Sequence, residues 1–238
     1  MKEQPLLDEI VLDCGQLSTR EINQKLKALA AEGVPSVKVL NPAGRHNLAV
    51  GMVHPITIHF LGAVGYYCGG LCDRVNIEVL GFCGWSVGEN LMNGKIVVRG
   101  NASANAAASA HGGKVFILGN AGPRAGISLK GGTLIVTGNV GYGSAFMMQQ
   151  GCMIVCGNAA ENLADSIYDG AIYVGGTVSS LGADAKFEPM LEQDWQLLER
   201  ELQPLGIKSE EYDFKKIVSA KELYHFKAQD WAKWKDAY

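Results

Sequence analysis

The chain has 238 residues, a formal net charge of −3 and a sequence pI near 6.0. That length can bury a sizeable core in one or two domains, and the mildly acidic balance gives no basis for binding nucleic acid or an anionic membrane surface. The N-terminal sequence is acidic where a signal peptide needs an apolar run, and no later stretch could span a bilayer. The sequence therefore predicts a cytoplasmic protein.

Residues 1–56 are predicted to form a small α/β cap. Ser18 and Glu21 have the spacing of a capping box. An apolar stripe follows at helical spacing, made of Ile22, Leu26, Leu29 and Ala30. Val37 and Val39 then suggest a strand. A helix and a strand of this kind can cover the first coil of the next domain, whose strand edges would otherwise be exposed.

Residues 57–189 repeat every nineteen residues. One column is glycine in every repeat: Gly62, Gly81, Gly100, Gly119, Gly138, Gly157 and Gly176. Two further columns are apolar and lie two positions apart, which is typical of a strand with one buried face. Nineteen residues are too few for a pair of helices, so each repeat is predicted to be one coil. The predicted fold class is an all-β solenoid, a right-handed parallel β-helix of about seven coils.

A polar column follows the corner glycine in four successive coils. Its members are Asn101, Asn120, Asn139 and Asn158. Stacked asparagines can bond amide to amide along a solenoid and suit a tight turn. A polar row lining a channel is the functional alternative. We interpret the column as a structural ladder, because repetition at one turn position is what a turn requires.

A second strip of the predicted coils is typical of a docking face. It precedes each closing glycine, and the middle member of each triplet is apolar and expected to point inward. Met and Tyr on an outer surface are enriched at interfaces. Candidates for contact with a partner are Tyr66, Tyr67, Met92, His111, Arg124, Met147 and Tyr168. His111 has no acidic or nucleophilic neighbour in its own or adjacent columns, which favours a surface residue over a general base.

Residues 190–238 are predicted to form a C-terminal helical and aromatic tail. Four apolar residues have helical spacing before a Pro-Leu-Gly break: Leu191, Trp195, Leu198 and Leu202. A second amphipathic segment is expected around residues 219–226. The tail either closes the last coil as a helix or inserts its aromatic end, with Trp231, Trp234 and Tyr238, into another subunit.

The six cysteines give a weak metal signal. Cys152 and Cys156 lie on one predicted strand, about 13 Å apart, so they cannot share a metal ion or a disulfide. Cys68 and Cys72 straddle a corner and could meet, but no histidine accompanies them. Reduced, mostly buried thiols are therefore expected. The sequence predicts no metal, cofactor-binding or catalytic residue in this chain, and any role of Cys68 and Cys72 stays open.

One pair of acidic residues is a candidate for catalysis. Asp165 and Asp184 occupy the same column in adjacent coils, and stacked carboxylates some 5 Å apart would suit a retaining glycosidase. A carbohydrate-active β-helix enzyme is therefore an alternative. A solvated or partner-facing acidic patch is favoured, because no basic or aromatic substrate groove accompanies the pair.

The glycine pattern also carries a family resemblance. Gly62-x-x-Gly65-x-x-x-Gly69 and its repeats resemble the GXGXG domain that ends the large subunit of glutamate synthase. Stretches such as 88–92 and 165–168 are more similar still to a free-standing form, the small glutamate-synthase-like subunit of N-methylglutamate synthase (methylamine–glutamate N-methyltransferase). The resemblance runs from about residue 41 to the C-terminus.

The resemblance implies a division of labour. In that family a class II amidotransferase-like subunit and an FMN-binding barrel subunit with iron–sulfur clusters carry the chemistry. The β-helix holds them apart and helps to channel ammonia or an amine. The resemblance therefore implies a non-catalytic scaffold subunit, and no family catalytic residue carries over to this chain. The related β-helix subunit of formylmethanofuran dehydrogenase is an alternative within the same class.

Overall fold

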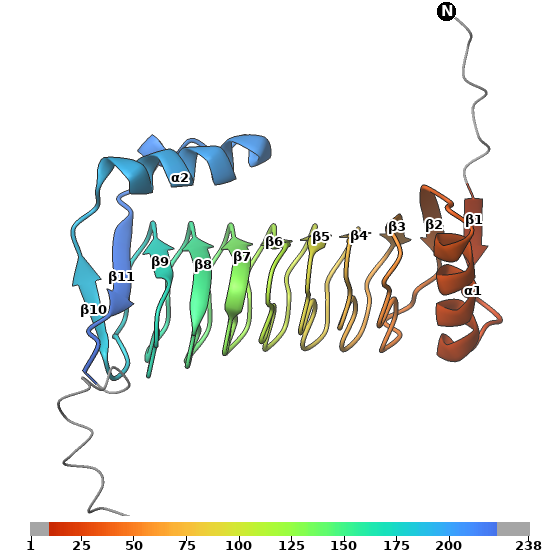
Figure 1. The fold of residues 1–238 in the computed structure, drawn as a ribbon, viewed down its shortest axis with the longest axis horizontal. Helices are drawn as coiled ribbons and strands as arrows, with labels where there is room; N and C mark the ends of the chain where they lie inside the picture. The colour runs from red at the N-terminus through yellow and green to blue at the C-terminus, as the bar shows by residue number, and fades with distance from the viewer. Residues whose placement is uncertain (1–9, 223–238) are drawn as a thin grey trace, which may run out of the picture.

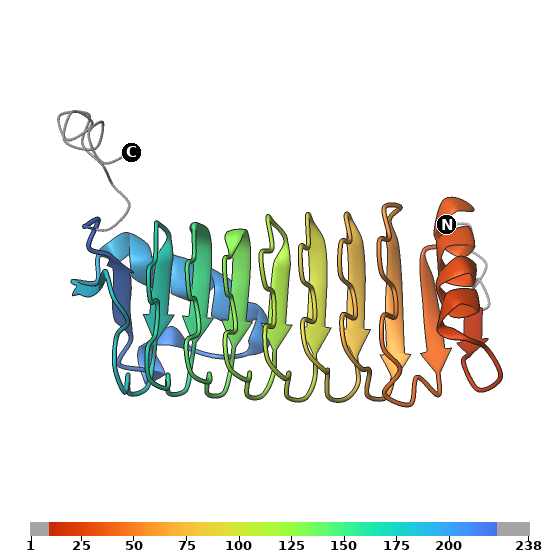
Figure 2. The same ribbon diagram turned by 90° about the horizontal axis from the view of Figure 1, so that it is seen from below.

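The structure, a computed structural model, describes residues 10–222. It is an elongated solenoid whose strands stack side by side along the long axis (Figures 1 and 2). The elements in chain order are β1 (Ile10–Asp13), α1 (Thr19–Ala31), β2 (Ser36–Leu40), β3 (Ile56–Leu61), β4 (Val75–Val79), β5 (Gly94–Val98), β6 (Lys114–Ile117), β7 (Lys130–Val136), β8 (Gln150–Val155), β9 (Ala171–Val174), β10 (Ala185–Glu188), α2 (Glu192–Leu202), η1 (Gln203–Leu205), η2 (Ser209–Glu211) and β11 (Lys215–Ser219).

The predicted parallel solenoid is confirmed. Neighbouring strands from β3 to β9 pair in parallel, as in the pairings of Ile58 with Ile77 and of Ile77 with Ile96. The partners are nineteen residues apart except for Lys130 and Gln150, which are twenty apart at a register shift between β7 and β8. A second ladder of isolated parallel bridges runs from Val64 through Cys83 to Val178. At about 4.8 Å between neighbouring strands, the stack from β3 to β9 spans roughly 29 Å.

One more coil precedes the repeat seen in the sequence. β2 pairs in parallel with β3, and Asn47 N–H donates to the carbonyl of Tyr66 in the next coil. Leu48 and Met52 are buried in the main core. The repeat is not visible here because Val37 pairs with Ile58, twenty-one residues later instead of nineteen.

Helix α1 begins and ends where its sequence signals lie. Ser18 Oγ accepts from the Glu21 N–H at 3.3 Å, and Glu21 Oε2 accepts from the Ser18 N–H at 2.8 Å, which completes the capping box. The buried face of the helix consists of Ile22, Leu26 and Ala30. This face joins the main core and covers the N-terminal end of the stack (Figure 1). Among residues 10–222, no helix has the length and apolar character needed to cross a bilayer.

The corner glycines and the asparagine ladder are parts of one structure. Asn139 N–H donates to Asn120 Oδ1 at 2.8 Å, and the same bond repeats along the column as far as Thr177. The ladder therefore runs from side chain to backbone, not from amide to amide as expected. A Cβ atom on Gly138 would lie 2.3 Å from Asn120 Oδ1 and 2.8 Å from the Gly119 carbonyl. Glycine is needed there for close approach, since its φ is not in the left-handed region.

The C-terminal end differs in part from expectation. Helix α2 covers the predicted residues, but the last coil is closed by strands and not by a helix. β11 pairs antiparallel with β9, and β10 pairs antiparallel with β11. Only part of the predicted segment 219–226 lies within the described residues, and Trp231, Trp234 and Tyr238 lie outside them.

Candidate functional site

The outer face of the parallel sheet changes character along the stack. One outward column, which alternates with the buried columns, runs from polar to apolar: His59, Glu78, Val97, Phe116, Ile135, Ile154 and Tyr173. Such outward positions meet water unless another element covers them. The change in polarity therefore marks where the face is covered.

Helix α2 covers the apolar half. Leu198 and Leu202 are fully buried in a second hydrophobic cluster with Ile135 and Ile154. Figure 2 shows the helix lying along the sheet at its C-terminal end. At the end of the helix, Glu201 is 4% exposed and pairs with Lys114 at 2.6 Å, which fixes α2 to β6.

Among residues 10–222, no helix covers the polar half over β3 to β5 (Figure 2). Glu78 lies at its centre, with Oε2 3.0 Å from His59 Nδ1 and Oε1 2.6 Å from Arg99 Nη2. The Arg99 hydrogen bond is the largest of the effects that lower the pKa of Glu78. Both carboxylate oxygens are engaged, so Glu78 is a poor general base and a good anchor for Arg99.

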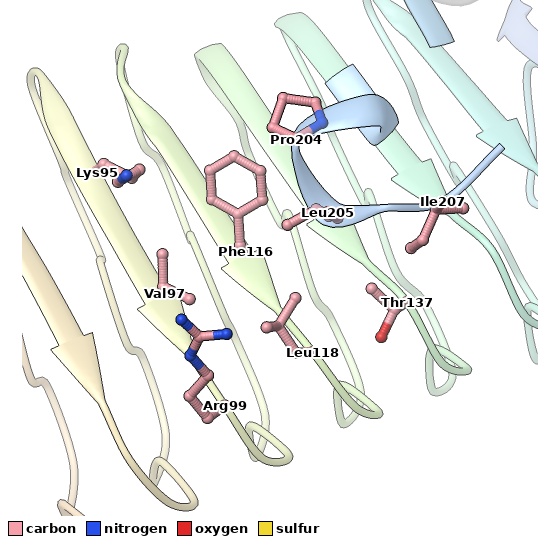
Figure 3. Close-up of a pocket in the computed structure, with 9 residues that line it drawn as sticks. All are labelled: Lys95, Val97, Arg99, Phe116, Leu118, Thr137, Pro204, Leu205 and Ile207. Atoms are coloured by element: carbon pink, nitrogen blue, oxygen red, sulfur yellow. The ribbon is translucent and has the colours of Figure 1, made fainter. Parts of the chain in front are cut away.

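Three adjoining hollows form a groove along this half, and we call them the outer groove. The first, of about 440 Å³, is lined by Lys95, Val97, Arg99, Phe116, Leu118, Thr137, Pro204, Leu205 and Ile207. Figure 3 shows Lys95, Val97 and Arg99 along one strand, facing the loop after α2 across Phe116. The second, of about 230 Å³, lies over His59 and Glu78, and the third, of about 790 Å³, follows the strand starts beside Arg200. Lys95 lines all three.

The outer groove is positively charged although the whole chain is acidic. Its cations are Lys95, Arg99, Lys114 and Arg200, and its carboxylates are Glu78 and Glu201. With His59 neutral, the groove carries an excess of two positive charges, against −3 for the chain. The side chain of Lys95 is exposed and makes no ion pair or hydrogen bond within residues 10–222. The excess of positive charge makes the groove electrostatically favourable for anions, and Phe116 lines it with an apolar side chain.

A buried polar network fixes the other end of α2. Tyr173 donates from its hydroxyl to Asp194 Oδ1 at 2.7 Å, and Lys216 Nζ lies 3.2 Å from Asp194 Oδ2 and 2.9 Å from Glu188. Burial acts to raise the pKa of Asp194, but the hydrogen bonds outweigh it and the pKa is lowered. The network joins β9, α2, β10 and β11.

A separate aromatic stack lies exposed on another corner of the early coils. The rings of His46 and Tyr66 are 4.1 Å apart, and those of Tyr66 and Trp85 are 5.1 Å apart, both nearly parallel. His46 Nδ1 also accepts from the Tyr66 N–H at 3.0 Å. Tyr66 is one of the contact candidates that the sequence offers, whereas Trp85 is not. The nineteen-residue spacing of Tyr66 and Trp85 was the available signal.

The remaining interface candidates are dispersed. Met92, His111 and Arg124 are exposed, whereas Tyr67, Met147 and Tyr168 are half-buried. The middle residues of the predicted strip are buried, as expected: Leu91, Ala110, Leu129, Met148 and Ile167. Tyr67, Arg124 and Met147 have positive φ angles, so these three candidates lie in left-handed turns. The structure brings none of these six into the outer groove.

The predicted stacking of Asp165 on Asp184 is wrong. The last coil is one residue short, since Leu163 pairs with Leu181, eighteen positions later. Asp165 therefore faces Ala183, whose N–H donates to Asp165 Oδ2 at 3.4 Å. Asp184 instead accepts from Ser219 and from the Glu222 N–H. The register that suggested a glycosidase pair is absent.

The cysteines are unpaired, and five of the six are buried. Cys72 donates from Sγ to the Ala49 carbonyl at 3.0 Å. Burial raises the pKa of Cys72 to about 11 and that of Cys83 to about 12. Residues 10–222 contain no group of three or more His, Cys, Asp or Glu side chains placed to hold a metal ion.

Fold and groove together describe a parallel β-solenoid that carries a cationic groove on the outer face of its sheet. A family model described as GXGXG motif matches residues 34–201. The chain therefore belongs to the GXGXG family, as its glycine columns predicted. It is also 40% identical over 64 residues to Protein GlxC of Rhizobium meliloti (strain 1021). That match covers 26% of this chain and 28% of the relative, so it is a local similarity.

Proposed function

We propose that this chain is a non-catalytic scaffold subunit of a glutamate-synthase-type complex. Family membership supports this proposal, and one structural observation carries it: an unbroken parallel stack from β2 to β9, with a continuous apolar core. Stacked strands that share backbone hydrogen bonds along the whole axis resist bending. Such a rod can hold two other proteins at a fixed distance.

The particular complex we propose is N-methylglutamate synthase, which converts methylamine and glutamate to N-methylglutamate and ammonia. The partners are a class II amidotransferase-like subunit and an FMN-binding glutamate-synthase-like subunit. FMN and the iron–sulfur cluster belong to that second partner. This choice rests on the resemblance of the coil motifs, since the similarity to Protein GlxC is local and covers 28% of that relative.

Ammonia or amine transfer is part of the same proposal. The inside of the coils is filled by large side chains with no exposed surface, such as Phe60, Leu134 and Met153. Close packing of this kind favours a route along the outside of the rod, between it and its partners, over a route through its core.

The test is purification of the tagged chain from its native source, followed by mass spectrometry and a flavin absorbance spectrum. The proposal predicts co-purification with an amidotransferase-like chain and a flavoprotein. A monomer without a flavoprotein partner would contradict it. Molybdenum or tungsten enzyme subunits in the eluate would instead identify a formylmethanofuran dehydrogenase scaffold.

A further inference from the structure

The geometry points to the outer groove as the docking site for an acidic, partly apolar segment of a partner protein, bound in extended form across the strands. This inference rests on the proposed function, because it names the surface through which the scaffold holds one partner.

Charge is the first argument for this occupant. The groove concentrates four cationic side chains on a chain whose net charge is −3, and two carboxylates compensate only half of them. Glu78 holds Arg99 in place, and Glu201 holds Lys114. Lys95 lies on β5, the strand that Arg99 directly follows, and beside Lys114, and it has no partner among the described residues. A carboxylate of a partner protein could form with Lys95 the ion pair that Arg99 and Lys114 already make within the chain.

Apolar lining is the second argument. Beside Lys95 and Arg99, the first hollow is walled by Phe116 and Leu118 of the sheet and by Leu205 of the loop after α2 (Figure 3). An inorganic anion would leave that wall unused. A peptide with alternating acidic and apolar side chains would place carboxylates toward Lys95 and an apolar side chain against Phe116.

The chain already uses this face of the sheet in the same way. Over β6 to β9 the outward column is covered by α2, which inserts Leu198 and Leu202 and pairs Glu201 with Lys114. The outer groove continues this surface: its lining extends from His59 on β3 to Thr137 after β7, four strand spacings or about 19 Å, which matches roughly six residues of extended peptide. The outer groove therefore has the length and chemistry for a second acidic, apolar segment.

Binding can be measured with the full-length protein and a fluorescein-labelled peptide of sequence Glu-Leu-Glu-Phe-Glu-Leu, by fluorescence anisotropy. One control peptide replaces Leu and Phe by Ser, and another replaces Glu by Lys. The protein variants are Lys95→Glu and Leu205→Ser. Lys25→Glu on the exposed face of α1 makes the same charge change away from the groove.

We expect the acidic apolar peptide to bind, and Lys95→Glu to weaken it at least tenfold. Leu205→Ser and the serine peptide should each cost at least threefold, and Lys25→Glu should cost less than twofold. Equal binding by wild type and Lys95→Glu would overturn the inference, as would equal binding of the acidic and lysine peptides. Equal binding of the serine peptide would reduce the site to charge alone and also overturn it.

The same variants separate this inference from the proposed function. If the wild-type chain co-purifies with its partners and Lys95→Glu does so equally well, the groove is not the docking site although the scaffold proposal stands. If the wild-type chain brings down no partner but binds the peptide through Lys95, the groove assignment holds and the scaffold proposal fails. Circular dichroism of each variant confirms that the solenoid is folded.

Discussion

The phenolic oxygen of Tyr173 lies 2.7 Å from Oδ1 of Asp194, in the buried contact between β9 and α2. The other oxygen of Asp194 accepts from Lys216 on β11 and from the Leu191 N–H at the start of the helix. A single carboxylate thus ties the last coil to the helix that covers the outer face. The position of α2, and with it the open end of the outer groove, depends on this network.

Asp194→Ala should destabilise the protein by about 3 kcal/mol, because it leaves the buried Lys216 ammonium and Tyr173 hydroxyl without this acceptor. The measurement is urea unfolding followed by circular dichroism. Asp213→Ala is the control, since the Asp213 side chain is 93% exposed and its ion pair with Lys215 should contribute under roughly 0.5 kcal/mol. A similar loss of unfolding free energy in both variants would show that the buried network around Asp194 does not stabilise the fold.

Stability should fall in acid. The pKa values of Asp194 and Glu78 lie below their ordinary values of 3.8 and 4.5 in the folded protein. Carboxylates of lowered pKa stabilise the fold fully above their unfolded pKa, and that contribution is lost as pH falls through the folded pKa. The free energy of unfolding should therefore be level above about pH 5 and drop below about pH 4.5. In Glu78→Gln the drop should be smaller, and an unchanged acid profile in that variant would contradict the assignment.

Gly138→Ala should destabilise the solenoid by about 2 kcal/mol, because the added Cβ would overlap Asn120 Oδ1 and force the coils apart. Gly15→Ala is the matched control: its Cβ would lie 3.3 Å from Asp13 Oδ1, and its φ is not left-handed. Thermal unfolding of both variants gives the comparison. Equal melting temperatures would show that the corner tolerates a side chain.

The cysteine thiols should be inert in the folded protein. Burial raises their pKa values, to about 11 for Cys72 and Cys156 and about 12 for Cys83 and Cys152, so few thiolates exist near neutral pH. We expect an aromatic disulfide reagent to label all six in urea and none within minutes in native buffer. Rapid labelling of one thiol in native buffer would identify an accessible, activated cysteine that the structure does not show.

The repeating columns of the sequence predicted the coils because each inward position packs against the equivalent position of the next coil and so needs the same kind of apolar side chain. Ile58, Ile77 and Ile96 stack directly upon one another, and the spacing between them is the register of the sheet. The first coil escaped detection because two extra residues separate Val37 from Ile58. The predicted stacking of Asp165 on Asp184 is wrong for the opposite reason, because the coil between them is shortened by one residue.

The outer groove is harder to predict from the sequence than the coils are. His59, Glu78 and Arg99 belong to outward columns, whose composition varies because solvent constrains it weakly. Their juxtaposition follows from the register, but the closure of one side by Pro204 and Leu205 depends on how α2 docks. That docking is a long-range contact, seen in the pairing of Lys114 with Glu201, and no local pattern predicts it.

The proposed function requires the solenoid to hold its two partners at a fixed distance, and lengthening the solenoid tests that requirement most directly. A second copy of residues 57–75, inserted before Asn76, adds one coil of about 4.8 Å while leaving α2 and the outer groove in place. In the purified complex we expect the variant to assemble and each partner to keep its own half-reaction, with the coupled transfer of ammonia or amine between the two partners falling at least fivefold. A coupled rate equal to that of the wild-type complex would contradict the account.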